Sequence, residues 1–441
     1  MAGLGGEPLA FGPAPRHAQG VNAAELAARS APDPGDLAAW HQRVRSAHAR
    51  LDPLVRRTPT VYSYTYSDCC SRDVHLTLEN LLRTGAFKIR GALNRLLQIE
   101  PEVRALGLVA ASAGNHAQGL ALAARLAEAR STIVMPESTA LIKVRRAEGY
   151  GATVILHGRS WDESHAHALE IAEKTGALYV HPFDDAEVIA GQGTVGLELL
   201  EQLPDLRQVV VPAGGGGLLA GMAVAIKGVR PDVRVIGVQA SGADALVQGF
   251  ESGTWVGIDR PSTIADGIRV GAPGKLTFEL IRRYVDDCVR VEEGEIVDAV
   301  VQSLQKARVV AEAAGVVGLA ALAAGRIPHD DEVCVVLSGG NIDLNLLGRM
   351  IEAGLSSAGL YHAVRVRIPD LPGHLGRVLE VVARSRANIM EVEHRRSGWQ
   401  VPVGSVDVDI LLEVRREGQG ELIEDALAAE GFDVRPAPRL T

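Results

Sequence analysis

Short apolar runs alternate with longer amphipathic segments along most of the chain up to about residue 350. Each run has the length and composition of a buried strand, and the runs cover residues 75–79, 107–111, 131–135, 153–156, 178–180 and 208–212. Helical patterns follow them, and a further amphipathic helix is predicted over residues 36–54. This alternation of strand and helix predicts an α/β fold with a parallel sheet covered on both faces. Ligands of such sheets bind outside the carboxyl ends of the strands.

The pattern changes near residues 355–360, which are expected to form a linker. Beyond it, strands are expected at 361–368, 388–395, 403–414 and 432–434, and helices at 376–386 and 421–430. The order strand–helix–strand–strand–helix–strand is that of a ferredoxin-like module. We therefore expect one domain over residues 36–354 and a second over residues 361–441. Residues 1–35 are rich in Ala, Gly and Pro and are expected to form a poorly ordered tail.

Composition argues against several kinds of partner. The 441 residues carry a formal net charge of -9 and include 4% aromatic residues, a poor match to a surface that binds nucleic acid. No apolar run reaches the ~18 residues of a membrane-spanning helix, and no secretion signal is recognisable at the start. Cys69, Cys70, Cys288 and Cys334 form neither a disulfide framework nor a metal-binding pattern. We expect a cytoplasmic protein without a metal site, and partners that include neither nucleic acid nor membrane.

Lys88 lies between Phe87 and Ile89 in the segment 84–92, with a glycine on each side. Apolar surroundings disfavour the ammonium form and lower the pKa of a lysine from ~10.4, as a nucleophilic lysine requires. Most other cations are arginines, and the five other lysines lie in polar or helix-like contexts typical of solvent-facing side chains. For an isolated lysine, a helix residue whose amine extends to solvent would be the simpler interpretation. The setting of Lys88 favours a reactive amine.

Four successive glycines, residues 214–217, stand between a predicted strand and a predicted helix. Successive glycines leave backbone N–H groups uncovered and the helix adds its positive end, so the loop is typical of a phosphate site. A closely packed turn is the structural alternative. Gly215, Gly217 and Gly221 also fit a dinucleotide-binding pattern, which requires an acidic residue at the end of the next strand. Because that strand ends in Gln239, the phosphate site is favoured.

Two further strand ends carry polar residues. The segment 112–116 follows one strand and begins a helix, whose free N–H groups can bind a carboxylate. Asn115 offers an amide to a phenolate oxygen, although Ser112 and Asn115 are equally suited to cap the helix. Ser338 can bond a ring nitrogen or act as a cap. Together with the lysine and the phosphate loop, these strand ends indicate an aldehyde cofactor that carries a phosphate, namely pyridoxal phosphate.

These motifs, in this order, resemble the threonine dehydratase (threonine ammonia-lyase) family of fold-type II pyridoxal-phosphate enzymes over about residues 37–351. The matching segments are 79–81, 84–92, 111–119, 214–217, 263–267, 311–319 and 338–341. The resemblance implies two α/β subdomains, the smaller of which covers about residues 107–184 and is inserted into the larger. It also implies α,β-elimination that converts L-threonine to 2-oxobutanoate and ammonia, with some activity on L-serine.

The resemblance also implies how the cofactor is held. Lys88 would bind the cofactor aldehyde and remove the substrate α-proton, and Phe87 would pack beside the cofactor ring. Asn115 would bond the 3-hydroxyl and Ser338 the pyridine nitrogen. The phosphate would be held by the glycine loop, which comprises Gly214, Gly215, Gly216 and Gly217.

A substrate loop is implied in the same way, and its residues are Ser112, Gly114, Asn115 and His116. The backbone N–H groups of Ser112, Asn115 and His116 would bind the substrate carboxylate. Serine racemases, which are related enzymes, carry a serine at the position of Ala113 as the acid/base on the opposite substrate face, so alanine favours an eliminase. The acids with which those relatives bind a divalent cation are missing here, so no tight divalent site is expected.

Residues 361–441 resemble an ACT regulatory domain through the segments 368–375 and 387–389. Such domains commonly bind amino acids at subunit interfaces, which implies a homo-oligomer (dimer or tetramer) with an amino-acid effector. A dimerisation module without an effector is the alternative. For the whole chain, a serine dehydratase or racemase-like enzyme and a non-catalytic amino-acid sensor remain alternatives. Retention of Lys88, the four glycines and Ser338 argues against the sensor, which needs no reactive amine.

Overall fold

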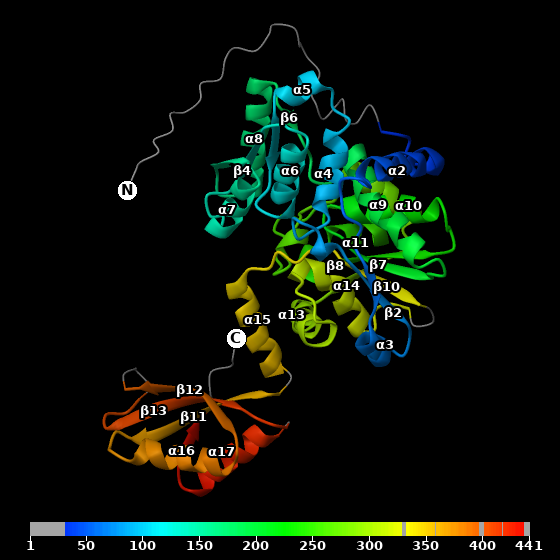
Figure 1. Ribbon diagram of the computed structural model, residues 1–441. Coiled ribbons are helices and arrows are strands. Elements are labelled where there is room, and N and C mark those ends of the chain that lie inside the picture. Colours follow the sequence, from blue (N-terminus) through cyan, green and yellow to red (C-terminus); the bar gives the residue numbers. More distant parts are fainter. Residues whose placement is uncertain (1–30, 329–331, 358, 397–400, 417, 436–441) are drawn as a thin grey trace. The chain divides into compact units, whose positions relative to one another are not determined.

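The computed structural model describes residues 31–328, 332–357, 359–396, 401–416 and 418–435. The chain divides into two compact units, Met1–Ile342 and Asp343–Thr441, and each is described by itself (Figure 1). The division lies before helix α15 (Leu344–Ser357), whereas the sequence pattern places a linker after it. Most of the predicted tail lies outside the described residues. Its last part, residues 31–35, is described, and there Pro34 O accepts a hydrogen bond from Tyr284 Oη over 2.9 Å.

The larger sheet of unit 1 has six strands in the order β1-β2-β10-β7-β8-β9. Strand β1 is antiparallel to β2, and every other neighbouring pair is parallel. The strands are β1 (Thr60–Tyr62), β2 (Val74–Leu78), β7 (Gln208–Pro212), β8 (Arg234–Ala240), β9 (Asp287–Val291) and β10 (Val333–Leu337). The central strands β7 and β10 are buried along their whole length, which explains their continuous apolar sequences. Because all strands of this sheet except β1 run parallel to one another, their carboxyl ends lie at the same edge of the sheet.

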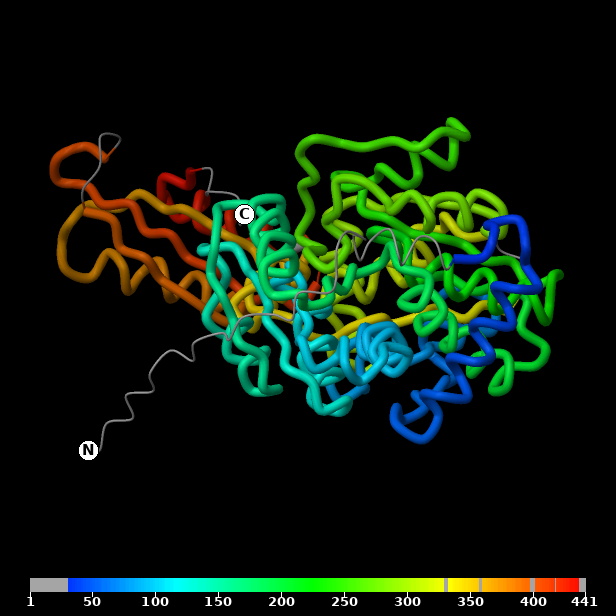
Figure 2. The backbone as a smooth tube through the Cα atoms, turned by 90° about the horizontal axis from the view of Figure 1, so that it is seen from above, coloured from blue at the N-terminus to red at the C-terminus, as the bar shows by residue number. Residues whose placement is uncertain are grey.

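A second, four-stranded parallel sheet forms a smaller lobe of unit 1, in the order β5-β4-β3-β6. Its elements are β3 (Leu108–Ala111), α6 (Asn115–Leu126), β4 (Ser131–Met135), α7 (Leu141–Gly149), β5 (Thr153–Leu156), α8 (Trp161–Thr175) and β6 (Leu178–Tyr179). Figures 1 and 2 show this cyan-to-green segment beside the larger sheet. Helix α4 (Lys88–Leu96) packs against α6 of the small lobe and against α9 (Ala186–Gln202) of the large lobe.

The remaining helices of unit 1 cover the larger sheet. Figure 1 shows α9 and α10 on one side of this sheet and α13 and α14 on the other. These helices and short turns are α2 (Leu37–Leu51), α3 (Tyr64–Cys70), η1 (Glu79–Leu81), α5 (Pro101–Ala105), α10 (Gly217–Lys227), η2 (Ser241–Ala243), α11 (Ala245–Ser252), η3 (Asp266–Ile268), α12 (Lys275–Tyr284), α13 (Glu293–Gln302), the π-helical turn η4 (Ser303–Ala307) and α14 (Ala313–Ala323). The predicted amphipathic helix near the start is α2, which buries Trp40, Val44, Ala47 and Leu51.

Unit 2 contains an antiparallel sheet in the order β12-β13-β11-β14. Its elements after α15 are β11 (Tyr361–Pro369), α16 (His374–Arg384), β12 (Asn388–Arg395), β13 (Ser405–Glu413), α17 (Gln419–Ala429) and β14 (Asp433–Arg435), the predicted ferredoxin-like order. Strands β11 and β13 alternate between core and surface. Val364 and Val366 are buried in the core, whereas Arg365 pairs with Asp409 on the other face.

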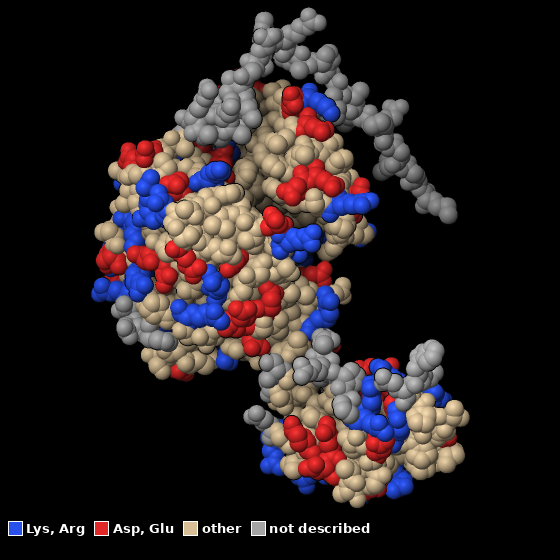
Figure 3. All heavy atoms as spheres, turned by 180° about the vertical axis from the view of Figure 1, so that it is seen from behind, with Lys and Arg blue, Asp and Glu red and all other residues tan. Residues whose placement is uncertain are grey.

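Within the described part of the chain, no helix has both the length and the apolar character needed to cross a membrane. The face drawn in Figure 3 carries acidic and basic side chains interspersed with one another.

Candidate active site

Lys88 is the first residue of α4. A β-bridge between Ala86 and Gly339, two residues after the end of β10, places this helix start at the carboxyl edge of the larger sheet. Its Nζ donates a hydrogen bond to Pro182 O over 2.8 Å and lies 5.1 Å from the centroid of the Phe87 ring. The surrounding protein desolvates the amine and lowers the pKa of Lys88 to about 8. A free amine is therefore accessible near neutral pH, as the apolar sequence around this lysine predicts.

The loop 338–341, which follows β10, holds the segment before Lys88 in place. The bonds run from Phe87 N to Ser338 O (3.2 Å), from Gly340 N to Gly85 O (2.8 Å) and from Asn341 Nδ2 to Thr84 O (2.7 Å). Ser338 is buried, and its hydroxyl bonds no group among the residues that the structure describes. The tertiary structure thus brings Ser338 next to Phe87 and Lys88, and leaves the hydroxyl available to a ligand.

The glycine loop connects β7 to α10. Gly216 has a φ of +94°, a backbone conformation that favours glycine, and it precedes α10 without a side-chain cap. The N–H groups of Gly214, Gly215 and Gly216 meet no acceptor in the described segments of the chain. A side chain at Gly215 would collide with the Phe183 ring. Uncovered N–H groups at the start of a helix are suited to an anion.

A segment that the sequence does not single out, residues 181–184, joins Lys88 to the glycine loop. Pro182 O accepts the Lys88 hydrogen bond, and the next residue, Phe183, packs on Gly215 and Gly217. Asp184 then accepts three backbone N–H groups, each over 3.1 Å, at the start of α12. This segment follows a short strand, and no feature of its composition separates it from an ordinary loop.

The predicted substrate loop lies between β3 and α6. Ser112 N donates to Val134 O over 3.1 Å, so the expectation that this N–H binds a carboxylate is not met. The Ser112 hydroxyl accepts from Gly114 N over 3.2 Å. Asn115 and His116 begin α6, and their N–H groups have no acceptor within the described ranges. These two N–H groups remain as the predicted carboxylate ligands.

The side chain of Asn115 is held between two residues of the large lobe. Its Nδ2 donates to Glu312 Oε1 over 2.5 Å, and its Oδ1 accepts from Asn341 Nδ2 over 2.8 Å. Burial, followed by the nearby charge of Asp266, raises the pKa of Glu312 to about 7. Asn115 keeps one N–H for a ligand oxygen. The sequence does not predict Glu312 and Asn341 as site residues, although both lie in motifs that carry the family resemblance.

Two histidines near Lys88 are neutral. Burial is the main cause that lowers the pKa of both His116 and His181 to about 3, and the charge of Lys88 contributes. His116 Nε2 lies 3.1 Å from Val180 O, and His181 Nδ1 accepts from Asp184 N over 2.8 Å. These rings add no charge to the site near neutral pH, so Lys88 stays the strongest base beside the glycine loop.

One ion pair links the two lobes beside Glu312. Lys143 Nζ on α7 lies 2.6 Å from Asp266 Oδ2 in η3. Lys143 was expected to face solvent, and its side chain is partly exposed (28%) although it crosses to the large lobe. No group of three or more His, Cys, Asp or Glu side chains suited to a metal ion occurs among the described residues.

The site thus combines an amine with a lowered pKa, an anion-binding glycine loop, an amide with a free N–H and two free N–H groups at the start of α6. This set fits a phosphorylated aldehyde together with an amino-acid carboxylate.

Comparisons with known proteins agree with this chemistry. A family model described as pyridoxal-phosphate dependent enzyme matches residues 51–339. The L-threonine ammonia-lyase of Thermotoga maritima is 46% identical over 392 residues, which cover 89% of this chain and 98% of that protein. The solved structure of processed threonine deaminase isoform 2 from Solanum lycopersicum is 33% identical, with a TM-score of 0.70 over 73% of this chain and 89% of that one. Maize serine racemase is 34% identical, with a TM-score of 0.68 over 72% of this chain and 98% of that one.

Proposed function

We propose that this chain, which belongs to the family of pyridoxal-phosphate dependent enzymes, is an L-threonine ammonia-lyase. The reaction would convert L-threonine to 2-oxobutanoate and ammonia. The observation that carries this proposal is the Lys88 amine, which has a lowered pKa and lies between the glycine loop and the loop 338–341. The similarity to the Thermotoga maritima L-threonine ammonia-lyase extends over 89% of the chain, so it includes much of unit 2.

The residues present fit pyridoxal phosphate. Gly214, Gly215 and Gly216 would hold its phosphate through N–H groups that have no acceptor among the described residues. Asn115 would bond its 3-oxygen, and the free hydroxyl of Ser338 would bond its pyridine nitrogen. Pyridoxal phosphate, when bound, supplies an electron-withdrawing ring system that stabilises negative charge at the substrate Cα.

The protein supplies the proton transfers and the orientation. The N–H groups of Asn115 and His116 bind the substrate carboxylate and so fix the direction of the Cα–H bond. Lys88 Nζ would take the Cα proton, a transfer worth typically ~10²–10⁴ in rate. Pro182 O bonds the same Nζ and limits where the amine can move. The β-hydroxyl of threonine would leave as water, which balances the proton removed from Cα, and hydrolysis of the remaining enamine would release 2-oxobutanoate and ammonia.

Ser338 supports elimination rather than racemisation. The neutral hydroxyl of Ser338 would bond the pyridine nitrogen without protonating it, whereas a carboxylate would favour the protonated form. The weaker electron withdrawal that the cofactor would then supply would favour loss of the β-hydroxyl. Ala113, which offers no proton to the opposite substrate face, agrees with this outcome.

The test uses the purified holoprotein with threonine. We expect a visible absorption band, release of 2-oxobutanoate, and borohydride reduction that fixes the cofactor on the peptide containing Lys88. Lys88→Ala should lose the band and the activity, whereas Lys174→Ala, which removes an exposed lysine on α8, should keep both. A colourless wild type that releases no keto acid, or cofactor fixed on another residue, would overturn the proposal.

For unit 2 we propose an ACT-like regulatory role in a homo-oligomer. The support is its ferredoxin-like element order and the resemblance in the segments 368–375 and 387–389. Initial rates with threonine, with and without isoleucine or valine, test the effector, and light scattering measures the oligomeric state. Rates unchanged by either amino acid would favour a dimerisation module.

A further inference from the structure

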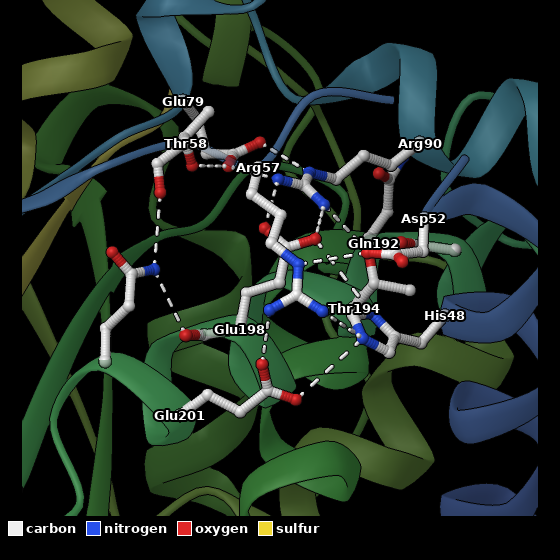
Figure 4. A network of polar contacts seen from close by, with 12 residues as sticks. His48, Asp52, Arg57, Thr58, Glu79, Arg90, Gln192, Thr194, Glu198 and Glu201 are labelled. Carbon is white, nitrogen blue, oxygen red and sulfur yellow. Dashed lines mark hydrogen bonds and ion pairs between the residues drawn. The ribbon is translucent and has the colours of Figure 1, made fainter. Parts of the chain in front are cut away.

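Arg90 lies two residues after Lys88 on α4, and its side chain has no exposed surface. Figure 4 shows its guanidinium enclosed by acceptors from other elements. All of its N–H groups have partners, namely Nε to Glu79 Oε2 (2.8 Å), Nη2 to Glu79 Oε1 (2.8 Å), Nη2 to Glu198 Oε2 (2.8 Å), Nη1 to Glu198 Oε1 (2.6 Å) and Nη1 to Thr194 Oγ1 (3.1 Å). The guanidinium therefore has one permitted position.

The acceptors are themselves fixed. Glu79 directly follows β2 and accepts a further hydrogen bond from Thr58 Oγ1 over 2.6 Å. Thr194 and Glu198 are on α9, and Thr194 Oγ1 donates to Gly191 O over 2.8 Å. A side chain at Gly191 would lie 2.6 Å from Arg90 O, so α4 and α9 are in close backbone contact at this residue. Arg90 thus ties α4 both to the end of a sheet strand and to α9.

Stability alone does not explain this arrangement. One guanidinium faces two buried carboxylates, so the three side chains carry a formal charge of −1 in the protein interior. Buried ion clusters are often no more stabilising than well-packed apolar residues. The planar guanidinium of arginine instead fixes the relative orientation of the groups that it joins, because each carboxylate is bound by two N–H groups at once.

Because Arg90 lies in the first turn of α4, the orientation that it fixes is that of the helix start, where Lys88 is located. Lys88 is the first residue of α4, and Phe87 before it provides no side-chain cap. The helix start is held on one side by the bond from Phe87 N to Ser338 O. On the other side, within the first helical turn, it is held by Arg90. A rotation or slide of α4 would move Lys88 Nζ directly, and a misplacement of about 1 Å can reduce a rate ~10²-fold.

We propose that Arg90 is a positioning residue for Lys88, holding the first turn of α4 against β2 and α9 so that the amine meets the substrate Cα proton. This inference rests on the proposed function, since it assigns a role within the same site. Arg90 touches neither substrate nor cofactor and acts through Lys88.

The experiment compares Arg90→Lys with a matched control on the same helix. Arg95 also ties α4 to the large lobe, through an ion pair of 3.0 Å with Asp185 at the start of α9, but it lies farther along the helix. Arg90→Lys keeps the positive charge but removes the planar guanidinium, and Arg95→Lys makes the same change at the control position. Glu198→Gln keeps the shape of an acceptor and serves as a second variant if Arg90→Lys does not fold.

Three quantities are measured on each holoenzyme: kcat and KM for threonine, the midpoint of the pH titration of the visible cofactor band, and the thermal midpoint. We expect Arg90→Lys to lose about 10²-fold in kcat, with a smaller change in KM and a displaced spectral midpoint. Glu198→Gln should change the same quantities in the same direction by less. Arg95→Lys should leave kcat and the spectral midpoint as in the wild type, even where the thermal midpoint falls.

Equal losses of kcat in the two arginine variants, or an unmoved spectral midpoint in both Arg90→Lys and Glu198→Gln, would overturn the positioning role. A wild type without keto-acid release would instead contradict the proposed function, so the two failures are distinguishable.

Discussion

Asn115 Nδ2 donates to Glu312 Oε1 over 2.5 Å, and this bond joins the small lobe to the large lobe inside the site. The amide is the first side chain of α6, and the carboxyl belongs to the residue that precedes α14. Because Asn341 bonds the other end of the amide, the orientation of Asn115 is set before any ligand binds. A carboxyl whose pKa lies near neutrality therefore controls an amide that faces the ligand.

The ionisation of Glu312 should make stability depend on pH. Burial raises the pKa of Glu312 from 4.5 to about 7, so between these values the folded protein holds a proton that the unfolded chain has released. The free energy of unfolding therefore falls by about 3 kcal/mol as the pH rises through this window, and this contribution is then constant.

Glu312→Gln cannot ionise and should lack this loss. Urea unfolding of the cofactor-free proteins at pH 5 and at pH 8 is the measurement. Relative to its value at pH 5, the free energy of unfolding of the variant minus that of the wild type should be larger by about 3 kcal/mol at pH 8. Parallel pH profiles for the two proteins would show that the carboxyl is already ionised when buried.

The lowered pKa of Lys88, about 8, should govern how fast the cofactor attaches. Only the neutral amine is nucleophilic, so the rate constant for covalent uptake of pyridoxal phosphate by cofactor-free protein should rise about tenfold per pH unit below pH 8 and level off above it. Stopped-flow absorbance measures this rate. A rate that keeps rising towards pH 10 would mean that the protein does not desolvate the amine.

The absence of a side chain at Gly215 should be needed for cofactor binding. A Cβ there would collide with the Phe183 ring, and forced overpacking of this kind typically costs about 1–3 kcal/mol. If this cost applies to the glycine loop when it holds the cofactor phosphate, Gly215→Ala should raise the Kd for pyridoxal phosphate about 5- to 150-fold.

Two variants give this prediction its controls. Gly294→Ala places a methyl group where no atom lies within 4 Å, and should leave the Kd unchanged. Adding Phe183→Ala to Gly215→Ala should restore part of the affinity, because it removes the ring that the methyl group meets. Equal affinity of Gly215→Ala and wild type would argue that the glycine loop can shift without loss.

The ion pair between Lys143 and Asp266 should contribute to substrate affinity more than to stability. Both side chains are partly exposed, so the pair is worth no more than about 1 kcal/mol to folding. It nevertheless joins the lobes on either side of the site. We expect Lys143→Met to raise KM for threonine up to about fivefold, the equivalent of that energy, with little change in thermal midpoint.

Lys174→Met is the matched control, because Lys174 pairs with Glu170 within α8 and does not reach the other lobe. The double variant with Asp266→Asn should show no further rise in KM beyond Lys143→Met. An additive rise would mean that the two residues act separately.

The local features of the site were predictable from the sequence because each is encoded in a few consecutive residues. The apolar setting of Lys88 predicted its lowered pKa, and the family match over residues 51–339 confirms the cofactor that the motifs indicated. The four glycines predicted a loop with uncovered N–H groups. Alternating strands and helices predicted the parallel sheets, and the change of pattern after residue 355 predicted the ferredoxin-like module.

The tertiary structure alone decided which distant residues complete these features. Asn115 and Glu312 are 197 positions apart, and Arg90 and Glu198 are 108 apart, so no local pattern pairs them. The N–H of Ser112 is used by a neighbouring strand, which the loop sequence could not show. Sequence periodicity records which side of an element is buried, whereas the partner of a buried polar group depends on how the elements pack. The sequence by itself therefore determined the apolar setting of the Lys88 amine and the anion-binding glycine loop, whereas the packing of the elements determined which residues hold them in place.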